Sequence, residues 1–84
     1  MATLPVLIVS LTTCEHCAEA KAFFKHLGIE PTVIEFDKVG LALKRQIAAD
    51  MRAHHIDGFP FVMIGGVAVN GYDPSAFEHL LAMN

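Results

Sequence analysis

The junction between an apolar run and a pair of cysteines restricts the fold of this chain more than any other feature. The run Pro5–Leu11, "PVLIVSL", is rich in β-branched residues and carries no charge, which is typical of a strand buried on both faces. Cys14 and Cys17 follow it, and the residues after them repeat apolar side chains at helical spacing. A strand that leads straight into a helix predicts an α/β domain with both cysteines at the start of that helix.

The next elements extend this unit. We expect the first helix over Cys14–Leu27, with Thr13 as its N-cap and Gly28 at its C-terminal end. β-branched residues return at Thr32, and Asp37 closes a second strand. A strand, a helix and a strand in this order form a right-handed crossover, so the two strands are expected to be parallel.

A second helical pattern covers Leu41–Met51 and predicts an amphipathic helix. Its expected apolar stripe consists of Leu41, Ile47, Ala48 and Met51, while Lys44, Arg45 and Arg52 are left to solvent. The segment "HHIDGF" is the expected exit loop.

The last third of the chain predicts a hairpin and a helix. Gly65 and Gly66 separate two apolar runs, which indicates a two-residue primed turn, and Pro60 has to stand at the start of a strand. For the final helix we expect Asp73 as N-cap, Pro74 in the first turn and a contact between Tyr72 and Phe77. The order is β-α-β-α-β-β-α, which we assign to one domain over residues 1–84.

Composition limits the class of protein. Hydrophobic residues make up 54% of the chain and charged residues 18%, so the chain has enough apolar surface to fold unaided. The net charge of −3 comes from interspersed signs, which excludes the basic surface of a nucleic-acid or anionic-membrane binder. Two cysteines are too few for a disulfide framework, and the N-terminal run lacks a positive leader and is too short to span a bilayer. We therefore expect a cytoplasmic protein whose partners are proteins or small molecules.

The spacing of the cysteines predicts thiol chemistry. A cysteine at a helix N-terminus meets free backbone N–H groups and the positive end of the helix dipole, which stabilise a thiolate. Cys14 has this position, and Cys17, almost one turn later, can attack a mixed disulfide formed at Cys14. We expect Cys14 to be the more exposed sulfur and Cys17 to face inward. Between them, a protonated His16 would stabilise the thiolate and Glu15 would oppose it.

Other roles for the pair fit less well. A zinc site needs two more ligands, and the candidates His54 and His55 are adjacent rather than three to five residues apart. Haem attachment needs a histidine after the second cysteine, where Ala18 stands. A structural disulfide across so short a loop gains little stability. Dithiol redox chemistry without a metal is therefore the favoured interpretation.

Three segments make the chain resemble the glutaredoxin family across nearly its whole length: "TTCEHC", "GFPFVMIGG" and "VNGYDP". The resemblance implies a thioredoxin-like fold, with a four-stranded mixed sheet and helices on both faces. It makes Cys14 the nucleophile, Cys17 the resolving cysteine and Pro60 a cis-proline. The residues that would contact glutathione or a substrate are then Thr13, the Phe59 backbone, Pro60, Gly71, Tyr72 and Asp73.

The resemblance also implies a function. We expect a monomeric thiol–disulfide oxidoreductase that holds no permanent cofactor, takes electrons from glutathione, and reduces protein disulfides or glutathione mixed disulfides. The chain departs from the family where Leu11-Thr12-Thr13 replaces a lysine before the first cysteine, where Glu15-His16 replaces Pro-Tyr, and where Asn70-Gly71 replaces two glycines. The "GYDP" segment also resembles redoxins that serve ribonucleotide reductase and take electrons from thioredoxin reductase. A glutathione-dependent iron–sulfur carrier is a further alternative.

Overall fold

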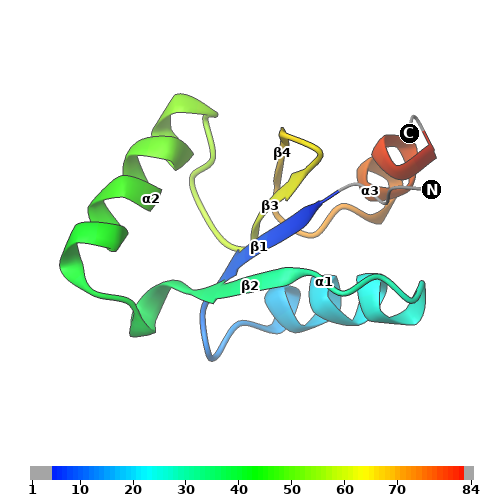
Figure 1. Cartoon of the computed structure of the whole chain (residues 1–84), viewed down its shortest axis with the longest axis horizontal. Helices are drawn as coiled ribbons and strands as arrows, with labels where there is room; N and C mark the ends of the chain where they lie inside the picture. Colours follow the sequence, from blue (N-terminus) through cyan, green and yellow to red (C-terminus); the bar gives the residue numbers. More distant parts are fainter. Residues whose placement is uncertain (1–4, 83–84) are drawn as a thin grey trace.

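The computed structural model describes residues 5–82 and contains the predicted elements in the predicted order (Figure 1). They are β1 (Val6–Ser10), α1 (Glu15–His26), β2 (Thr32–Glu35), a short 3-10 helix η1 (Phe36–Lys38), α2 (Leu41–Ala53), β3 (Phe61–Ile64), β4 (Val67–Asn70) and α3 (Pro74–Ala82). The strands form one sheet in the order β2-β1-β3-β4. β2 runs parallel to β1 as expected, and the other two pairs are antiparallel. The domain assigned to residues 1–84 extends beyond the described residues at both ends.

Successive side chains of a strand point to opposite faces of the sheet, so apolar strands expose apolar residues on both faces. Helices cover both of these faces. α1 and α3 pack on one face and α2 packs on the other. The first face buries Val6, Ile8, Ala20, Phe24, Val62, Ile64, Val69 and Phe77, and the second buries Val9, Ile47, Met51, Ile56 and Phe61. None of the helices within residues 5–82 is long and apolar enough to cross a membrane.

Aromatic rings hold α1 and α3 together. The Phe24 and Phe77 ring centroids lie 5.0 Å apart, and Phe23 lies 5.4 Å from Phe77. The predicted contact between Tyr72 and Phe77 is confirmed, with centroids 6.0 Å apart. Phe24 and Phe77 are completely buried, so this cluster is the centre of the larger core.

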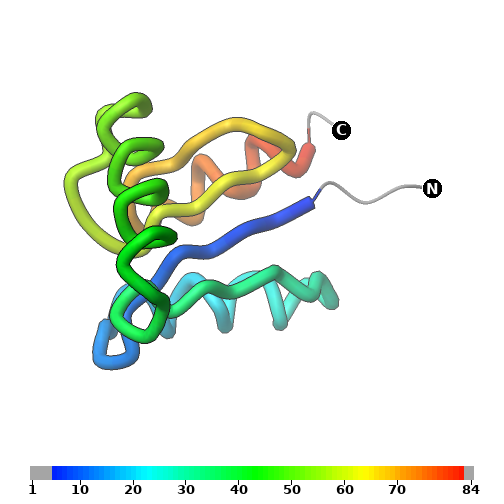
Figure 2. Tube along the Cα trace, turned by 60° about the vertical axis from the view of Figure 1, so that its left-hand side comes forward, coloured from blue at the N-terminus to red at the C-terminus, as the bar shows by residue number. Residues whose placement is uncertain are grey.

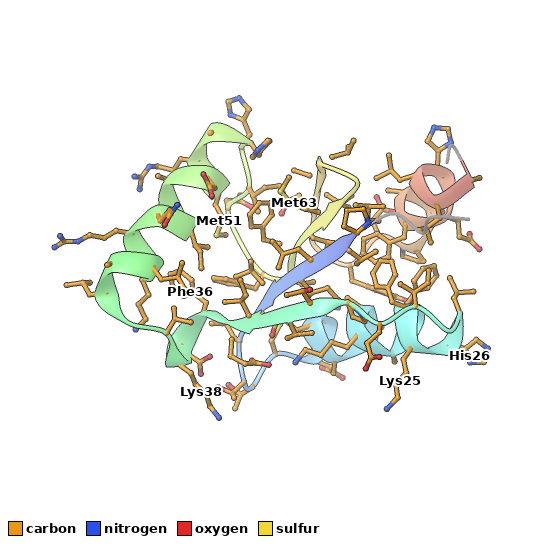
Figure 3. The ribbon with its side chains drawn as sticks, viewed as in Figure 1. Lys25, His26, Phe36, Lys38, Met51 and Met63 are labelled. Carbon is orange, nitrogen blue, oxygen red and sulfur yellow. The ribbon has the colours of Figure 1, made fainter. Side chains whose placement is uncertain are left out.

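The prediction for α2 is only partly correct. Ile47 and Met51 are buried, and Figure 3 shows Met51 between the helix and the sheet. Leu41, however, is 63% exposed and does not belong to the apolar stripe. Helical residues advance by about 100°, which places Leu41 roughly 120° from Ile47 around the helix. Lys44, expected in solvent, is half-buried.

Glycines end α1 and make the hairpin turn, as predicted. Gly28 has φ +76°, its N–H donates to Lys25 O at 3.0 Å, and the next N–H, of Ile29, donates to Phe24 O at 2.9 Å. This pattern is a Schellman motif, which needs the left-handed conformation that glycine adopts without strain. Gly65 and Gly66 have φ values of 57° and 87°, consistent with a primed turn.

The cysteine loop and the hairpin turn lie at opposite ends of the sheet. Register pairs Ser10 with Glu35 and Phe61 with Asn70, so β1, β2 and β4 finish where β3 starts. The cysteine loop lies at this end. The opposite end holds the Gly65–Gly66 turn, the start of β1 and the last residues of α3, which lie near each other in both views (Figure 2).

Candidate active site

Cys14 is the N-cap of α1, which corrects the assignment of Thr13 to that role. Cys14 has an extended backbone (φ −124°, ψ 116°), and its Sγ accepts the N–H of Cys17 at 3.3 Å. Thr13 is exposed and lies one residue too early, because helical geometry starts only at Glu15. A sulfur atom thus takes the place that an oxygen usually occupies at a helix start. Cys14 is half-buried, so a substrate can reach it.

Cys17 is fully buried, as predicted for the second cysteine. Burial, followed by the hydrogen bond with the Cys14 side chain, raises the pKa of the Cys17 thiol to about 11. The main chain of Leu11 and the charge of Lys21 act in the opposite direction on the same pKa. Cys14 is therefore partly accessible, and its sulfur accepts a hydrogen bond. Cys17 is buried, and its thiol stays protonated at neutral pH.

The dipeptide between the cysteines points away from the core. Glu15 and His16 are both exposed, and the His16 Nδ1 lies 3.2 Å from a Glu19 carboxylate oxygen, one turn further along α1. His16 therefore has a partner of its own on the helix surface. Tuning of the redox couple by these two residues stays a prediction.

Pro60 stands immediately before β3, and its peptide bond with Phe59 is cis, as the resemblance implied. Pro60 is fully buried, and its carbonyl accepts the N–H of Gly71 at 2.9 Å. The Phe59 ring packs on Phe36 with centroids 5.2 Å apart. Because Phe61 pairs with Val9, the cis-proline lies at the same end of the sheet as the cysteine loop.

The segment that starts α3 has mainly structural contacts. Gly71 has φ +80°, and the Asp73 Oδ1 accepts the N–H of Ala76 at 3.2 Å, which confirms Asp73 as the N-cap. Tyr72 packs on Phe77 and lines a surface groove of about 490 Å³ between α1 and α3. The proposed contacts of these residues with glutathione stay predictions.

Two polar contacts that the sequence did not indicate hold the cysteine loop. The Thr12 N–H donates to Asp37 Oδ1 at 3.2 Å, and its hydroxyl donates to the other carboxylate oxygen. The Thr12 hydroxyl is the main cause that lowers the pKa of Asp37. This contact joins the loop to the segment after β2, and parallel pairing of β1 with β2 was the signal that could have revealed it.

A second polar group lies beneath the loop. Ser10 Oγ donates to Glu35 Oε2 at 3.0 Å, and Lys21 Nζ donates to Glu35 Oε1 at 2.8 Å. The Lys21 ammonium is the largest cause that lowers the pKa of Glu35. We call these three residues the Ser10–Glu35–Lys21 network. A lone serine in an apolar run and a lysine four residues after Cys17 were its signals in the sequence.

The residues weighed as zinc ligands are not assembled. His54 and His55 follow the last turn of α2 and are exposed. Within the described range 5–82, no three histidine, cysteine or carboxylate side chains are grouped as metal ligands.

Comparisons with known proteins agree with this geometry. The glutaredoxin family model matches residues 6–69. Monothiol glutaredoxin-S10 of Oryza sativa subsp. japonica is 35% identical over 71 residues, which are 84% of this chain and 43% of that protein. The crystal structure of an Archaeoglobus fulgidus glutaredoxin aligns with a TM-score of 0.80 and 27% identity, covering 92% of this chain and 85% of that one. A buckwheat glutaredoxin–glutathione complex aligns with a TM-score of 0.77 and 26% identity, covering 95% and 78%.

This chain belongs to the glutaredoxin family and has its thioredoxin-like fold. Members of this family are in general thiol–disulfide oxidoreductases. The chain spans less than half the length of the rice relative. Similarity to the NrdH-redoxin of Escherichia coli, with a TM-score of 0.75 and 22% identity over 90% of this chain and 93% of that one, shows the shared fold alone.

Proposed function

We propose that this chain is a dithiol oxidoreductase that reduces protein disulfides or glutathione mixed disulfides through Cys14 and Cys17. The observation that carries the proposal is the difference between the two sulfurs. Cys14 is half-buried and accepts a hydrogen bond, whereas Cys17 is fully buried and protonated at neutral pH. Such a pair divides the work between a first nucleophile and a second thiol that acts only after the first.

The reaction follows from this division. The Cys14 thiolate attacks one sulfur of the substrate disulfide, forms a mixed disulfide and releases one substrate thiolate. Cys17 then attacks the Cys14 sulfur, and the second substrate thiol leaves. The substrate gains two electrons, and the protein keeps a disulfide between Cys14 and Cys17. An external reductant returns the pair to the dithiol.

Glutathione is our proposed reductant. Family membership supports it, and a relative of the same fold is described in complex with glutathione. Pro60 and Gly71 lie at the sheet end that carries the cysteines, where an extended thiol peptide would pair with the Phe59 backbone. The missing lysine before Cys14 removes one charged contact, which costs about tenfold in affinity without abolishing binding.

Variants of the two cysteines test the proposal. Alkylation of the reduced protein at neutral pH is expected to modify Cys14 first. Cys17→Ser is expected to retain a glutathione adduct that mass spectrometry detects, and Cys14→Ser is expected to form none. Faster alkylation of Cys17, or turnover of a disulfide substrate by Cys14→Ser, would reverse the assignment.

The electron source needs a separate assay. The oxidised protein is offered either glutathione with glutathione reductase or thioredoxin reductase, with NADPH consumption as the readout. We expect turnover in the glutathione arm. Turnover only with thioredoxin reductase would replace glutathione by the redoxin alternative and leave the cysteine chemistry unchanged.

A further inference from the structure

The second step of the proposed reaction has an obstacle. Cys17 has to lose its proton before it can attack, because the thiolate rather than the thiol is the nucleophile. In the reduced protein, burial and then the hydrogen bond with the Cys14 side chain raise the pKa of the Cys17 thiol to about 11. Cys17 is fully buried, so burial, the larger of these two causes, still opposes the thiolate when Cys14 is bonded to the substrate. A charged group that favours the thiolate would remove part of this barrier.

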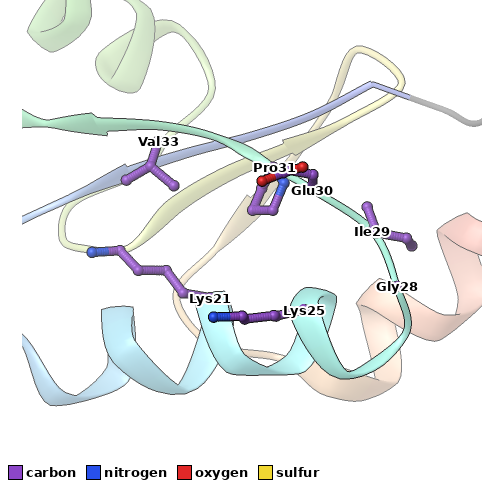
Figure 4. A pocket seen from close by; sticks show the side chains of 7 residues that line it. All are labelled: Lys21, Lys25, Gly28, Ile29, Glu30, Pro31 and Val33. Atoms are coloured by element: carbon purple, nitrogen blue, oxygen red, sulfur yellow. The ribbon is translucent and has the colours of Figure 1, made fainter.

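Lys21 lies in the position that such a group needs. It follows Cys17 by four residues on α1, and side chains with this spacing lie on the same helix face with Cβ atoms about 5–6 Å apart. Figure 4 shows the Lys21 side chain directed back along α1 toward its N-terminal end, where the cysteines are. Its positive charge acts on Cys17 in the direction that favours the thiolate.

The Ser10–Glu35–Lys21 network holds this ammonium in place. Lys21 Nζ lies 2.8 Å from Glu35 Oε1, and Ser10, which is fully buried, donates to Glu35 Oε2 at 3.0 Å. The Lys21 and Glu35 side chains are only 35% and 26% exposed, so water screens them incompletely. Ser10 directly precedes Leu11, whose main chain hydrogen-bonds to Cys17. Two members of the network are therefore linked to Cys17: Lys21 lies one turn further along α1, and Ser10 is next to Leu11 in the cysteine loop.

We propose that Lys21 is a positioning residue for the resolving step: Glu35 and Ser10 hold its ammonium where it stabilises the Cys17 thiolate. The proposal rests on the dithiol function proposed above. In this step Cys17 gives its proton to a solvent base and attacks the Cys14 sulfur. The bond between Cys14 and the substrate sulfur breaks, the Cys14–Cys17 bond forms, and the departing thiolate takes a proton from water.

Other charged groups near the pair are exposed to solvent or have partners of their own. Glu15 is exposed at the first turn of α1, and the exposed His16 pairs with Glu19. Asp37 binds Thr12 and also lies close enough to Glu35 to raise its pKa slightly. Cys14 contributes no thiolate during this step, since its sulfur is then bonded to the substrate. Lys21 is thus the cation of α1 that acts on Cys17.

The experiment isolates the resolving step. A mixed disulfide between Cys14 and an aromatic chromogenic thiol is prepared at acidic pH, and the pH is then raised in a stopped-flow instrument. Release of the coloured thiol reports the attack by Cys17. Lys21→Met is compared with Lys21→Arg, and with Lys25→Met as a matched control. Lys25 is the next lysine on α1. Lys21 and Lys25 both line a groove of about 460 Å³ between α1 and the segment that leads into β2, but Lys25 is exposed (Figure 4).

We expect Lys21→Met to slow release about three- to tenfold at pH 7 and to move the pH midpoint up by about half to one unit, since one pKa unit is a tenfold change in thiolate population. Lys21→Arg should restore most of the rate, and Lys25→Met should match the unmodified protein. Alkylation of Cys14 by iodoacetamide should keep its rate in all three variants. This second measurement shows that α1 and its N-cap are intact.

Two outcomes would overturn the role of Lys21. One is an unchanged midpoint in Lys21→Met, and the other is an Arg variant as slow as the Met variant, which would indicate a packing role only. Failure of the proposed function looks different. In that case release from the unmodified protein would be no faster than release from Cys17→Ser.

Discussion

The helices on the two faces of the sheet differ in how completely their side chains are buried and how their ends are capped. On the α1 and α3 face, Phe24, Phe77, Ile8 and Val62 are completely buried, and side-chain or glycine caps fix both ends of α1 and the start of α3. The strand residues of the two faces are similarly buried, but the buried residues of α2, Ile47 and Met51, retain 6% and 8% exposure where Phe24 and Phe77 retain none. α2 starts at Gly40 without a side-chain cap, and its first turn carries the exposed Leu41.

The difference follows the chemistry. The cysteines belong to α1, so the helix that sets their geometry is the one packed most completely. Charge is also divided: residues 36–55 carry four lysines and arginines against two aspartates, although the whole chain has a net charge of −3. α2 therefore presents a positively charged surface to solvent on a helix that carries neither cysteine. Five substitutions test this contrast.

The largest effect is expected on the first face. Phe77→Ala removes a completely buried ring that contacts Phe23, Phe24 and Tyr72. We expect the free energy of unfolding to fall by about 3–5 kcal/mol, measured by urea denaturation. A loss below about 2 kcal/mol would mean that this face is not the better-packed one.

Met51→Ala makes the matched change on the second face. Met51 is 8% exposed and unbranched, and α2 can shift to fill the space that it leaves. We expect a loss of about 2 kcal/mol in the same experiment, the low end for such a truncation. An effect as large as that of Phe77→Ala would remove the distinction between the faces.

Asp73→Ala tests the cap of α3. The substitution deletes the carboxylate that accepts the Ala76 N–H, which is expected to cost about 1 kcal/mol of stability. The matched control is Asp57→Ala, since Asp57 is exposed and makes only a 3.4 Å contact with Asn70. Equal losses in both variants would argue against a capping role.

Glu35→Gln tests the ion pair between Lys21 on α1 and Glu35 at the end of β2, by the pH dependence of the free energy of unfolding. The pKa of Glu35 is lowered in the folded protein, first by Lys21, from its ordinary value of 4.5. A depressed carboxyl pKa stabilises the fold above the unfolded value, and this contribution disappears as the pH falls through the folded value. The variant should therefore be less stable than the unmodified protein at pH 7, by under about 1 kcal/mol. The difference should narrow below about pH 4, and a constant difference would contradict the assignment.

Gly40→Asp should give the smallest change, and it should be stabilising. Gly40 has an extended backbone at negative φ, and a Cβ there meets no atom within 4 Å. A carboxylate at this N-cap can accept a free N–H of the first turn and adds about 0.3 kcal/mol. A lower melting temperature in this variant would indicate that the start of α2 is strained rather than uncapped.

The sequence predicted the order of the elements because it depends on local signals. Apolar runs marked β1 and β3, and the glycines at 28, 65 and 66 marked turns that the structure places where expected. The cysteine pair was informative for the same reason, since its chemistry depends on a helix start and a spacing of three. The sequence points to Thr13 as the cap because threonine is a preferred N-cap residue and cysteine is not, whereas the structure uses the Cys14 sulfur as the acceptor.

The contacts around the cysteines could not be read in the same way. Glu35 and Asp37 are far from Ser10 and Thr12 in the chain, and only the register between β1 and β2 brings them together. The exposure of Leu41 cannot be predicted from the sequence for a related reason. Helical spacing alone does not say how far a stripe extends over the sheet beneath it.

The placement of the first strand and the last helix has a consequence for assembly into larger proteins. The start of β1 and the end of α3 lie together at the end of the sheet opposite the cysteines. A domain tethered at either point leaves the entrance to Cys14 open, and the tether can be short because it does not have to pass around the sheet. A further domain joined to either point would therefore lie on the side of the sheet away from the cysteine loop.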